Sequence, residues 1–273
     1  MQKRLDAHVY AEEIRRAQDE RSRLEPFTAR VEGFDDAFGY EVSRLIHAAR
    51  LQAGWTARGR KIGFTNPAMW EVYGVREPNW AYVYDRTMMS VKDETARCAA
   101  GRFVEPKIEP EIILHLRTAP PVTDDLRALL ECIDWIAHGF EIVQSHFPGW
   151  RFRAADTIAN SALHGMLLVG EPQPIGRLGG DVIEDLGRFT LTLACDGVVR
   201  ERGRGANVLG NPLTALAHLI AVIAKQPGAL PLQAGELVTT GTLTAAMPVR
   251  AGERWSTRLE GIAIPGCALE FTP

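Results

Sequence analysis

The sequence predicts an α+β protein in which a helical N-terminal segment rests on a mixed β-barrel-like or sandwich-roll body. Apolar residues recur at helical spacing through the first fifty or so positions, which predicts helices there. From Gly59 onward, short apolar runs bounded by Gly and Pro replace that pattern. These runs do not alternate regularly with helices, so a βαβ array is disfavoured. We divide the chain into a helical cap, residues 1–70, and a β-barrel-like domain, residues 71–273.

The cap is predicted to contain two principal helices. The first has its apolar positions scattered among charges at near-helical spacing: Leu5, Val9, Ala11 and Ile14. After a break at Pro26, Asp35 and Asp36 can cap a second helix, and Gly54 can end it. The apolar stripe expected on this second helix consists of Tyr40, Val42, Leu45, Ile46 and Leu51.

The body begins with three predicted strands, at residues 61–65, 81–84 and 108–116. Pro110 lies early in the third strand and lacks a backbone N–H, so we expect this strand to lie at a sheet edge or to begin irregularly. A helix is predicted over residues 126–137 because its apolar positions follow the i, i+3, i+4, i+7 pattern.

The second half of the body is predicted to contain a strand, a buried helix and a β-rich tail. The strand covers residues 140–143. Asn211 followed by Pro212 is typical of a helix N-terminus, and the segment 213–225 is apolar on nearly all sides, which predicts a buried helix. The tail, residues 237–271, is predicted to form short strands separated by glycine turns.

Composition excludes several classes of function. The 273 residues include 31 Lys and Arg against 34 Asp and Glu, a net charge of −3 without any basic block, so we expect neither nucleic acid nor a membrane as partner. The first residues are charged and no apolar run reaches the length of a membrane span, which predicts a cytoplasmic protein. The four cysteines are widely spaced, which argues against a zinc site and against a disulfide framework. Dinucleotide, phosphate-loop and serine-hydrolase motifs are absent from the sequence.

The sharpest candidate for a chemical site is a pair of glutamates in the strand predicted at 108–116. Glu109 and Glu111 share one face because side chains alternate along a strand, and their Cα atoms would lie about 6.5 Å apart. Glu141, in the strand predicted at 140–143, supplies a third carboxylate. Oxygen ligands of this kind suit Mg²⁺ or Mn²⁺ rather than zinc. A solvent-facing acidic pair on a half-exposed strand is the alternative.

Lys61 is a second candidate, because the strand predicted at 61–65 can carry it inward. A partly buried lysine can bind a substrate carboxylate or transfer a proton. A surface lysine is the alternative.

Seven short motifs, in order along the chain, resemble the 2-keto-4-pentenoate hydratase / 4-oxalocrotonate decarboxylase family of the fumarylacetoacetate hydrolase superfamily. The resemblance runs from about residue 20 to the C-terminus. The motifs are residues 59–65 (GRKIGFT), 77–78 (EP), 106–112 (PKIEPEI), 141–145 (EIVQS), 156–159 (DTIA), 205–212 (GANVLGNP) and 240–244 (TGTLT).

The resemblance implies the fumarylacetoacetate hydrolase type of fold and a Mg²⁺ or Mn²⁺ ion held by Glu109, Glu111 and Glu141. Lys61 matches the active-site lysine of the family. Substrates of the family are short 2-hydroxy-dienoates or 2-keto-enoates from the cleavage of aromatic rings, whose 2-keto and carboxylate oxygens chelate the metal. Within the matched motifs and the loop behind them, we expect Lys61, Ser161 and Thr244 to bind the substrate.

The segment after the third glutamate departs from the family pattern. An Ala-Asp-Asn-Ala-Ser sequence is usual there, whereas this chain has Asn160 and Ser161 in place of the Asp and Asn, and Leu163-His164 at the end. Asn160 cannot act as a general base. His164 is our candidate for supplying the lost acid–base capacity, and a bystander on a diverged loop is the alternative. Near residues 77–78, Asn79 and Ala81 replace a common acidic residue and a glycine.

Four functions are therefore weighed. The leading one is a metal-dependent hydro-lyase that adds water to a 2-hydroxy-2,4-dienoate to give a 4-hydroxy-2-ketoacid in aromatic meta-cleavage catabolism. A 4-oxalocrotonate-type decarboxylase is second, with Arg86, Arg151 or Arg153 as the contact for its second carboxylate. An acylpyruvate hydrolase and a non-catalytic paralogue that pairs with an active partner complete the set. The resemblance also implies a homo-oligomer and a possible complex with a related hydratase or decarboxylase.

Overall fold

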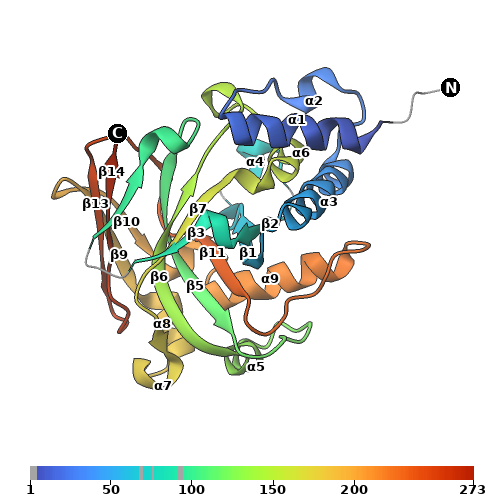
Figure 1. The fold of residues 1–273 in the computed structure, drawn as a ribbon. Coiled ribbons are helices and arrows are strands. Elements are labelled where there is room, and N and C mark those ends of the chain that lie inside the picture. The colour runs from blue at the N-terminus through green and yellow to red at the C-terminus, as the bar shows by residue number, and fades with distance from the viewer. Residues whose placement is uncertain (1–4, 68–69, 76, 92–94) are drawn as a thin grey trace.

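Two β-sheets and an N-terminal group of helices make up the protein (Figure 1), seen in a computed structural model that describes residues 5–67, 70–75, 77–91 and 95–273. The helices are α1 (Ala7–Glu20), α2 (Phe27–Arg30), α3 (Asp36–Gln52), α4 (Trp70–Tyr73), α5 (Leu126–Glu131), α6 (Ala154–Ala159), α7 (Ile175–Leu178), α8 (Val182–Arg188) and α9 (Pro212–Lys225). Helices α1 to α3 gather at one end of the larger sheet, as the predicted cap requires. The α+β class is confirmed.

The larger sheet has nine strands and carries the residues of interest. Its order is β2-β1-β11-β5-β6-β7-β3, with β12 beside β5 and β8 beside β6. Its strands are β1 (Ala57–Gly63), β2 (Asn79–Tyr84), β3 (Met88–Ser90), β5 (Lys107–Leu116), β6 (Ile133–Val143), β7 (His164–Val169), β8 (Gln173–Pro174), β11 (Leu237–Thr242) and β12 (Met247–Pro248). The β1/β11 and β3/β7 pairs are parallel and the other pairs are antiparallel, so the sheet is mixed. The long strands β5 and β6 curve through its centre (Figure 1).

The smaller sheet has five strands in the order β10-β9-β13-β14-β4. These are β4 (Ala96–Ala99), β9 (Thr190–Cys195), β10 (Val198–Arg204), β13 (Arg254–Glu260) and β14 (Ala268–Thr272). Only β14 and β4 run parallel. In β9, buried residues alternate with residues that are more exposed, as expected for a strand with one face on a core.

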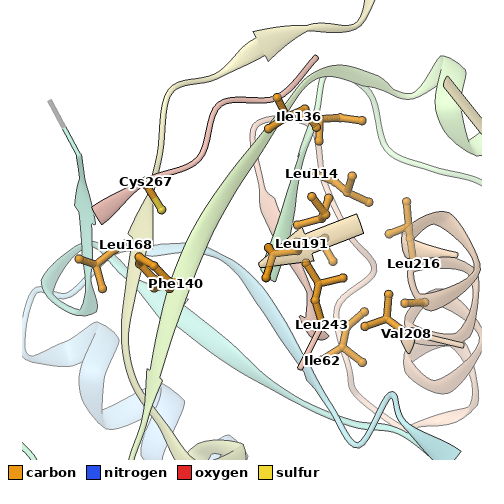
Figure 2. Close-up of a cluster of buried hydrophobic side chains, with 14 of the residues drawn as sticks. Ile62, Leu114, Ile136, Phe140, Leu168, Leu191, Val208, Leu216, Leu243 and Cys267 are labelled. Atoms are coloured by element: carbon orange, nitrogen blue, oxygen red, sulfur yellow. The ribbon is translucent and has the colours of Figure 1, made fainter. Parts of the chain in front are cut away.

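One large apolar core joins the two sheets and α9. Figure 2 shows its parts: Leu114 and Ile136 from the larger sheet, Leu191 from the smaller one, and Leu216 from α9. All four side chains are fully buried. Burial of side chains this size contributes about 1.5–3 kcal/mol each, so this core holds the central strands in place.

Helix α9 belongs to this core, as its sequence predicts. Asn211 caps it by accepting from the Leu213 backbone N–H, and Pro212 is its first residue. By length and composition the stretch Gly205–Lys225 could cross a membrane, so the expectation that no segment reaches that length is wrong here. Its residues Leu213, Leu216 and Leu219 are nevertheless at most 1% exposed inside the protein. A buried core helix has the same composition as a membrane span.

The cap packs on the body through its own aromatic cluster. Ile14, Phe27 and Ile46 lie in one buried group with Val143 and Leu163 of the body. Asp35 caps α3 by accepting from the Phe38 N–H, as predicted. Two residues assigned to the apolar stripes, Val9 and Leu51, are exposed instead. The helix faces are set by small residues such as Ala7, Ala11 and Ala17 on α1, which allow close approach.

The division at residue 70 remains a prediction about domains, but one strand bears on it. The structure pairs β1, which lies N-terminal to that point, with β2 and β11 of the larger sheet. The helical part of the cap ends with α3 at Gln52. The segment that carries Lys61 therefore belongs to the sheet.

The helix predicted over residues 126–137 is wrong in its second half. Helix α5 ends at Glu131, and β6 begins at Ile133. Ile136 pairs with Leu114 and Ala137 with Ile113 in the β5–β6 ladder. Pairing with a long buried partner strand outweighs the local helical spacing of these apolar residues.

Strand β5 is central, so the prediction of an edge position is wrong, and its pairing with β6 runs in regular register through Pro110. The irregularity lies on the other side, where the register with β11 shifts between Thr239 and Thr242. Strand β5 pairs with β6 on one side and with β11 and β12 on the other. The Pro110 carbonyl accepts from the Leu243 N–H, so its missing donor faces the side where the chain passes from β11 to β12. Neither β11 nor β12 has a described residue in register with Pro110, which explains how a central strand tolerates a residue without an N–H donor.

Candidate active site

Three carboxylates converge on the inner face of the larger sheet. Glu109 of β5 stands directly opposite Glu141 of β6, and Glu111 lies two residues further along the same face of β5. Carboxylate oxygens of the three lie within 4.8 Å of one another. Glu111 and Glu141 are fully buried, and Glu109 is half-buried. The solvent-facing alternative for this pair is therefore wrong.

Lys61 joins this cluster because of strand register. It is paired with Thr239 of β11, which is paired in turn with Ile113 of β5, and Ile113 shares the face of Glu111. The Lys61 Nζ lies 3.2 Å from Glu141 Oε2 and donates to the Ala162 carbonyl at 3.0 Å. Its side chain is 4% exposed, so the surface alternative is wrong.

Glu111 is held by β11 through one of its oxygens only. The Thr239 hydroxyl and the Gly241 N–H both donate to Oε2, the latter at 2.9 Å. Gly241 has φ +95°, and a Cβ there would lie 1.9 Å from the Thr65 hydroxyl, so only glycine fits this close approach. The other oxygen, Oε1, is buried without a hydrogen-bond partner.

Glu141 is bound on both sides. His164 Nδ1 lies 2.7 Å from Oε1, opposite the contact of Oε2 with Lys61. His164 Nε2 contacts the Thr87 hydroxyl at 2.9 Å. A chain of side chains therefore runs from Thr87 through the imidazole to the carboxylate, and it orients Glu141.

The three carboxylates differ in the direction in which the surroundings shift their pKa values. Burial and the neighbouring Glu141 raise the pKa of Glu109 to about 7 and that of Glu111 well above its usual range. Burial also acts to raise the pKa of Glu141, but Lys61 and His164 outweigh it and the pKa is lowered. Burial acts to lower the pKa of Lys61, yet the three carboxylates outweigh it and the pKa is raised. The buried Lys61 thus faces three carboxylates, two of which are fully buried.

This excess of buried negative charge fits a divalent cation. The donor set consists of oxygens alone, which is the preference of hard cations such as Mg²⁺ and Mn²⁺. The unpartnered Oε1 of Glu111 supplies an acceptor that a bound cation would satisfy.

A cavity of about 340 Å³ opens above the cluster. Lys61, Glu109 and Thr244 line it, so three of the predicted site residues share one space. Much of its wall is apolar and comes from Phe64, Val143, Trp150, Phe152 and Leu163. A short organic acid with an unsaturated tail fits this combination of a charged floor and an apolar wall.

Lys107 and Asn79 are among the polar residues of this cavity that were not predicted as site residues. Lys107 Nζ lies 3.9 Å from the ring centroid of Trp150 on the cavity wall. Asn79 donates to the Thr157 hydroxyl at 2.9 Å, while its Oδ1 is buried without a partner. The signals available were the position of Lys107 two residues before Glu109 and the departure of Asn79 from the family pattern.

A turn at residues 161–163 forms one wall of the cavity. Ser161, Ala162 and Leu163 all have positive φ, between 47° and 64°, although none is glycine. Such backbone costs about 1–3 kcal/mol per residue and persists only where the surroundings impose it. The Ala162 carbonyl accepts from Lys61, and Gln18 of α1 donates to both Asn160 and Ser161.

The turn directs two predicted site residues away from the cavity. Ser161 and His164 line a smaller pocket on its other side, whereas Ala162 and Leu163 line the cavity itself. Arg86 also lines the smaller pocket, and the exposed Arg151 and Arg153 line neither space. The structure therefore does not bring Ser161, His164 or these arginines to the cavity that holds Lys61.

Comparison with known proteins identifies the family. Residues 77–266 match the family described as fumarylacetoacetate (FAA) hydrolase, C-terminal. The chain belongs to the fumarylacetoacetate hydrolase family. It is similar to a 2-keto-4-pentenoate hydratase of Burkholderia vietnamiensis (strain G4 / LMG 22486), with 30% identity over 253 residues, 92% of this chain and 93% of that one. Within the family it is also 30% identical over 217 residues to a 4-oxalocrotonate decarboxylase of a Pseudomonas species, covering 78% of each chain.

The predicted fold type is confirmed by a solved structure. The 4-oxalocrotonate decarboxylase from Pseudomonas putida G7, complexed with magnesium and adipate, superposes with a TM-score of 0.87 over 98% of this chain and 99% of that one, at 24% identity. This likeness shows the fumarylacetoacetate hydrolase fold. The sequence relatives show an enzyme family with both hydratases and decarboxylases.

Proposed function

We propose that this protein is a metal-dependent hydro-lyase that adds water to a 2-hydroxy-2,4-dienoate and yields a 4-hydroxy-2-ketoacid in aromatic meta-cleavage catabolism. The observation that carries the proposal is the buried cluster of three carboxylates beside Lys61, at the floor of a cavity with an apolar wall. Relatives named as hydratases over 92% of the chain support the same reaction.

Glu109, Glu111 and Glu141 would hold Mg²⁺ or Mn²⁺. When bound, the cation polarises the 2-keto oxygen of the substrate and stabilises the negative charge that develops there. The chain's own contribution is to fix the ligands: Thr239 and Gly241 orient Glu111, and Lys61 and His164 orient Glu141.

Lys61 would bind the substrate carboxylate rather than act as a base. The three carboxylates outweigh burial and raise its pKa, so the amine is protonated at neutral pH and has a hydrogen to donate. Thr244 offers a second polar contact on the cavity wall. His164 and Ser161 act through Glu141 and the turn, so we assign them positioning roles in place of direct catalysis or binding.

One observation favours the decarboxylase as the second candidate. Lys107 lies on the cavity wall and offers a cation to a second carboxylate of a diacid substrate. A 4-oxalocrotonate decarboxylase is among the relatives at 30% identity. The two reactions are distinguished by their products.

The decisive experiment is a spectrophotometric assay with 2-hydroxypenta-2,4-dienoate, in Mg²⁺ or Mn²⁺ and again in EDTA. We expect metal-dependent loss of the near-ultraviolet dienol band, with the hydroxyketoacid confirmed by mass. Lys61→Met should lower kcat/KM by about 10–100-fold through loss of a charge-assisted contact with the substrate, while Lys225→Met, an exposed lysine at the end of α9, should not. Carbon dioxide release from oxalocrotonate without hydration would select the decarboxylase. Turnover of acylpyruvates alone, or of none of these substrates, would overturn both in favour of the hydrolase or the non-catalytic paralogue.

The expected cytoplasmic location, the homo-oligomer and the complex with a related hydratase or decarboxylase remain predictions. Size measurement in solution, alone and with a related subunit, tests the last two.

A further inference from the structure

A second pocket, of about 170 Å³, lies between the cap and the body on the far side of the turn at residues 161–163. Arginines reach it from three separate elements: Arg50 from α3, Arg86 from the turn after β2, and Arg102 from the turn after β4. Segments distant in the sequence thus bring three guanidinium groups to one small space.

The three guanidinium groups differ in their partners. Arg50 is 9% exposed and pairs with Asp19 at 2.8 Å, and it also donates to Gln18 Oε1 at 3.1 Å. Arg86 and Arg102 have no acidic partner among the residues that the structure describes. Asp19 is the only carboxylate on the described lining of the pocket. The charge that remains without compensation is therefore that of two arginines.

Two of the three guanidinium groups lie over one aromatic ring. Arg50 and Arg86 both lie over the ring of Trp55, with 4.3 and 5.5 Å between guanidinium carbon and ring centroid. Stacking of this kind restricts a guanidinium group in orientation while leaving its N–H donors available. Gln144 and Thr87 add neutral polar groups to the lining.

We propose that this pocket binds a small dianion, of the dicarboxylate or phosphate class. Two uncompensated arginines match a charge of two, and planar guanidinium forks bind carboxylate and phosphate oxygens in pairs. The volume admits only a small molecule. The inference is independent of the proposed reaction, because the pocket and the catalytic cavity share no lining residue.

The position of the pocket connects it with the catalytic cavity. Ser161 and His164 face the pocket, and Ala162 and Leu163 face the cavity, so the turn is a shared wall. Thr87 and His164 also link the pocket lining to Glu141. A bound dianion would therefore lie one side chain away from a proposed metal ligand.

The test uses the full chain labelled with 5-fluorotryptophan, in EDTA so that chelation at the carboxylate cluster plays no part. The ¹⁹F signal of Trp55, assigned with Trp55→Phe, is followed during titration with inorganic phosphate and, separately, with succinate. Potassium chloride at equal ionic strength is the blank. We expect a saturable shift in at least one arm, and the arm that saturates first identifies the class of ligand.

The double variant Arg86→Gln/Arg102→Gln should weaken that binding at least tenfold, because both uncompensated charges are removed. The matched control Arg177→Gln/Arg200→Gln removes two exposed arginines that do not line the pocket, and it should bind as the wild type does. A shift of Trp55 that does not saturate in either arm, or that persists unchanged in the Arg86/Arg102 variant, would overturn the proposal. Assignment spectra of each variant show whether it is folded.

Discussion

The cavity lined by Lys61 and Glu109 has a floor and a side wall of different construction. Its floor stands on regular strands, where Lys61, Glu109, Glu111 and Glu141 are placed by ladder register and side-chain alternation. Its side wall is the turn at residues 161–163, whose backbone lies in an unfavourable region and is held by contacts from the cap. The strands of the floor determine where the charged side chains lie, and the turn of the side wall determines the shape of the cavity.

The largest expected effect is a difference in stability between two carboxylate substitutions in the floor of the cavity. Glu141→Gln should destabilise the metal-free protein by about 3 kcal/mol, because Lys61 loses the partner that compensates its buried charge. Glu111→Gln should change stability by less than about 1 kcal/mol, since the amide oxygen still accepts from Thr239 and Gly241 and one like charge is removed. Urea unfolding in EDTA measures both.

The two substitutions should nevertheless have the same effect on metal binding. Each removes an anionic oxygen from the cluster, so each should abolish tight binding of Mn²⁺ in calorimetry. Equal losses of stability in the two variants would show that Lys61 does not depend on Glu141 in particular.

An intermediate effect concerns the support of the turn. His146 Nδ1 lies 3.0 Å from the Asn160 amide nitrogen, an arrangement that requires a neutral imidazole as acceptor. Burial lowers the pKa of His146 from 6.5 to about 4. The unfolded chain therefore binds the extra proton between pH 6.5 and 4, and the stability present above pH 6.5 is lost as the pH falls through that range, by about 2 kcal/mol at pH 5.

The comparison of His146→Gln with the exposed control His8→Gln isolates this contribution. His47 and His138 also have pKa values lowered to about 4 by burial, so the variant should keep part of the wild-type pH dependence. Unfolding free energies at pH 7 and pH 5 should differ less in His146→Gln than in the control. If the change in unfolding free energy between pH 7 and pH 5 were the same in both variants, protonation of His146 would not contribute to the pH dependence of stability.

The smallest expected effect tests whether the cap supports the turn that forms the side wall. Gln18→Ala removes two hydrogen bonds to the turn and should cost about 1 kcal/mol, with a fall in kcat/KM of up to about tenfold as Ala162 and Lys61 lose their exact alignment. Gln52→Ala, on the exposed end of α3, is the matched control. Lost stability with unchanged kcat/KM would mean that the strands alone set the geometry.

The floor of the cavity was the more predictable part. Alternation places Glu109 and Glu111 on one face from the sequence alone, the predicted strands make Glu141 and Lys61 candidates, and the resemblance groups the four residues. The opposition of Glu109 to Glu141 depends on β5–β6 register, which no local pattern specifies. The same ladder converts half of the helix predicted over residues 126–137 into strand.

The side wall was not predictable, for a physical reason. In a sequence, glycine or asparagine normally indicates a residue with positive φ, whereas the residues with positive φ here are Ser161, Ala162 and Leu163. Their conformation comes from contacts with Lys61 and Gln18, which are more than 100 residues away in the chain. The orientation of Ser161 and His164 away from the cavity follows from that turn.

Pro110 has a consequence for how the chain finds its pairing. Because neither β11 nor β12 has a described residue in register with Pro110, a proline can be accommodated at this position of β5. A slip of one residue would turn Glu109 and Glu111 to the opposite face, and it would also set the proline ring against a carbonyl that needs a donor. The residue between the two glutamates therefore adds an energetic cost to the misaligned sheet in which the acidic cluster could not assemble.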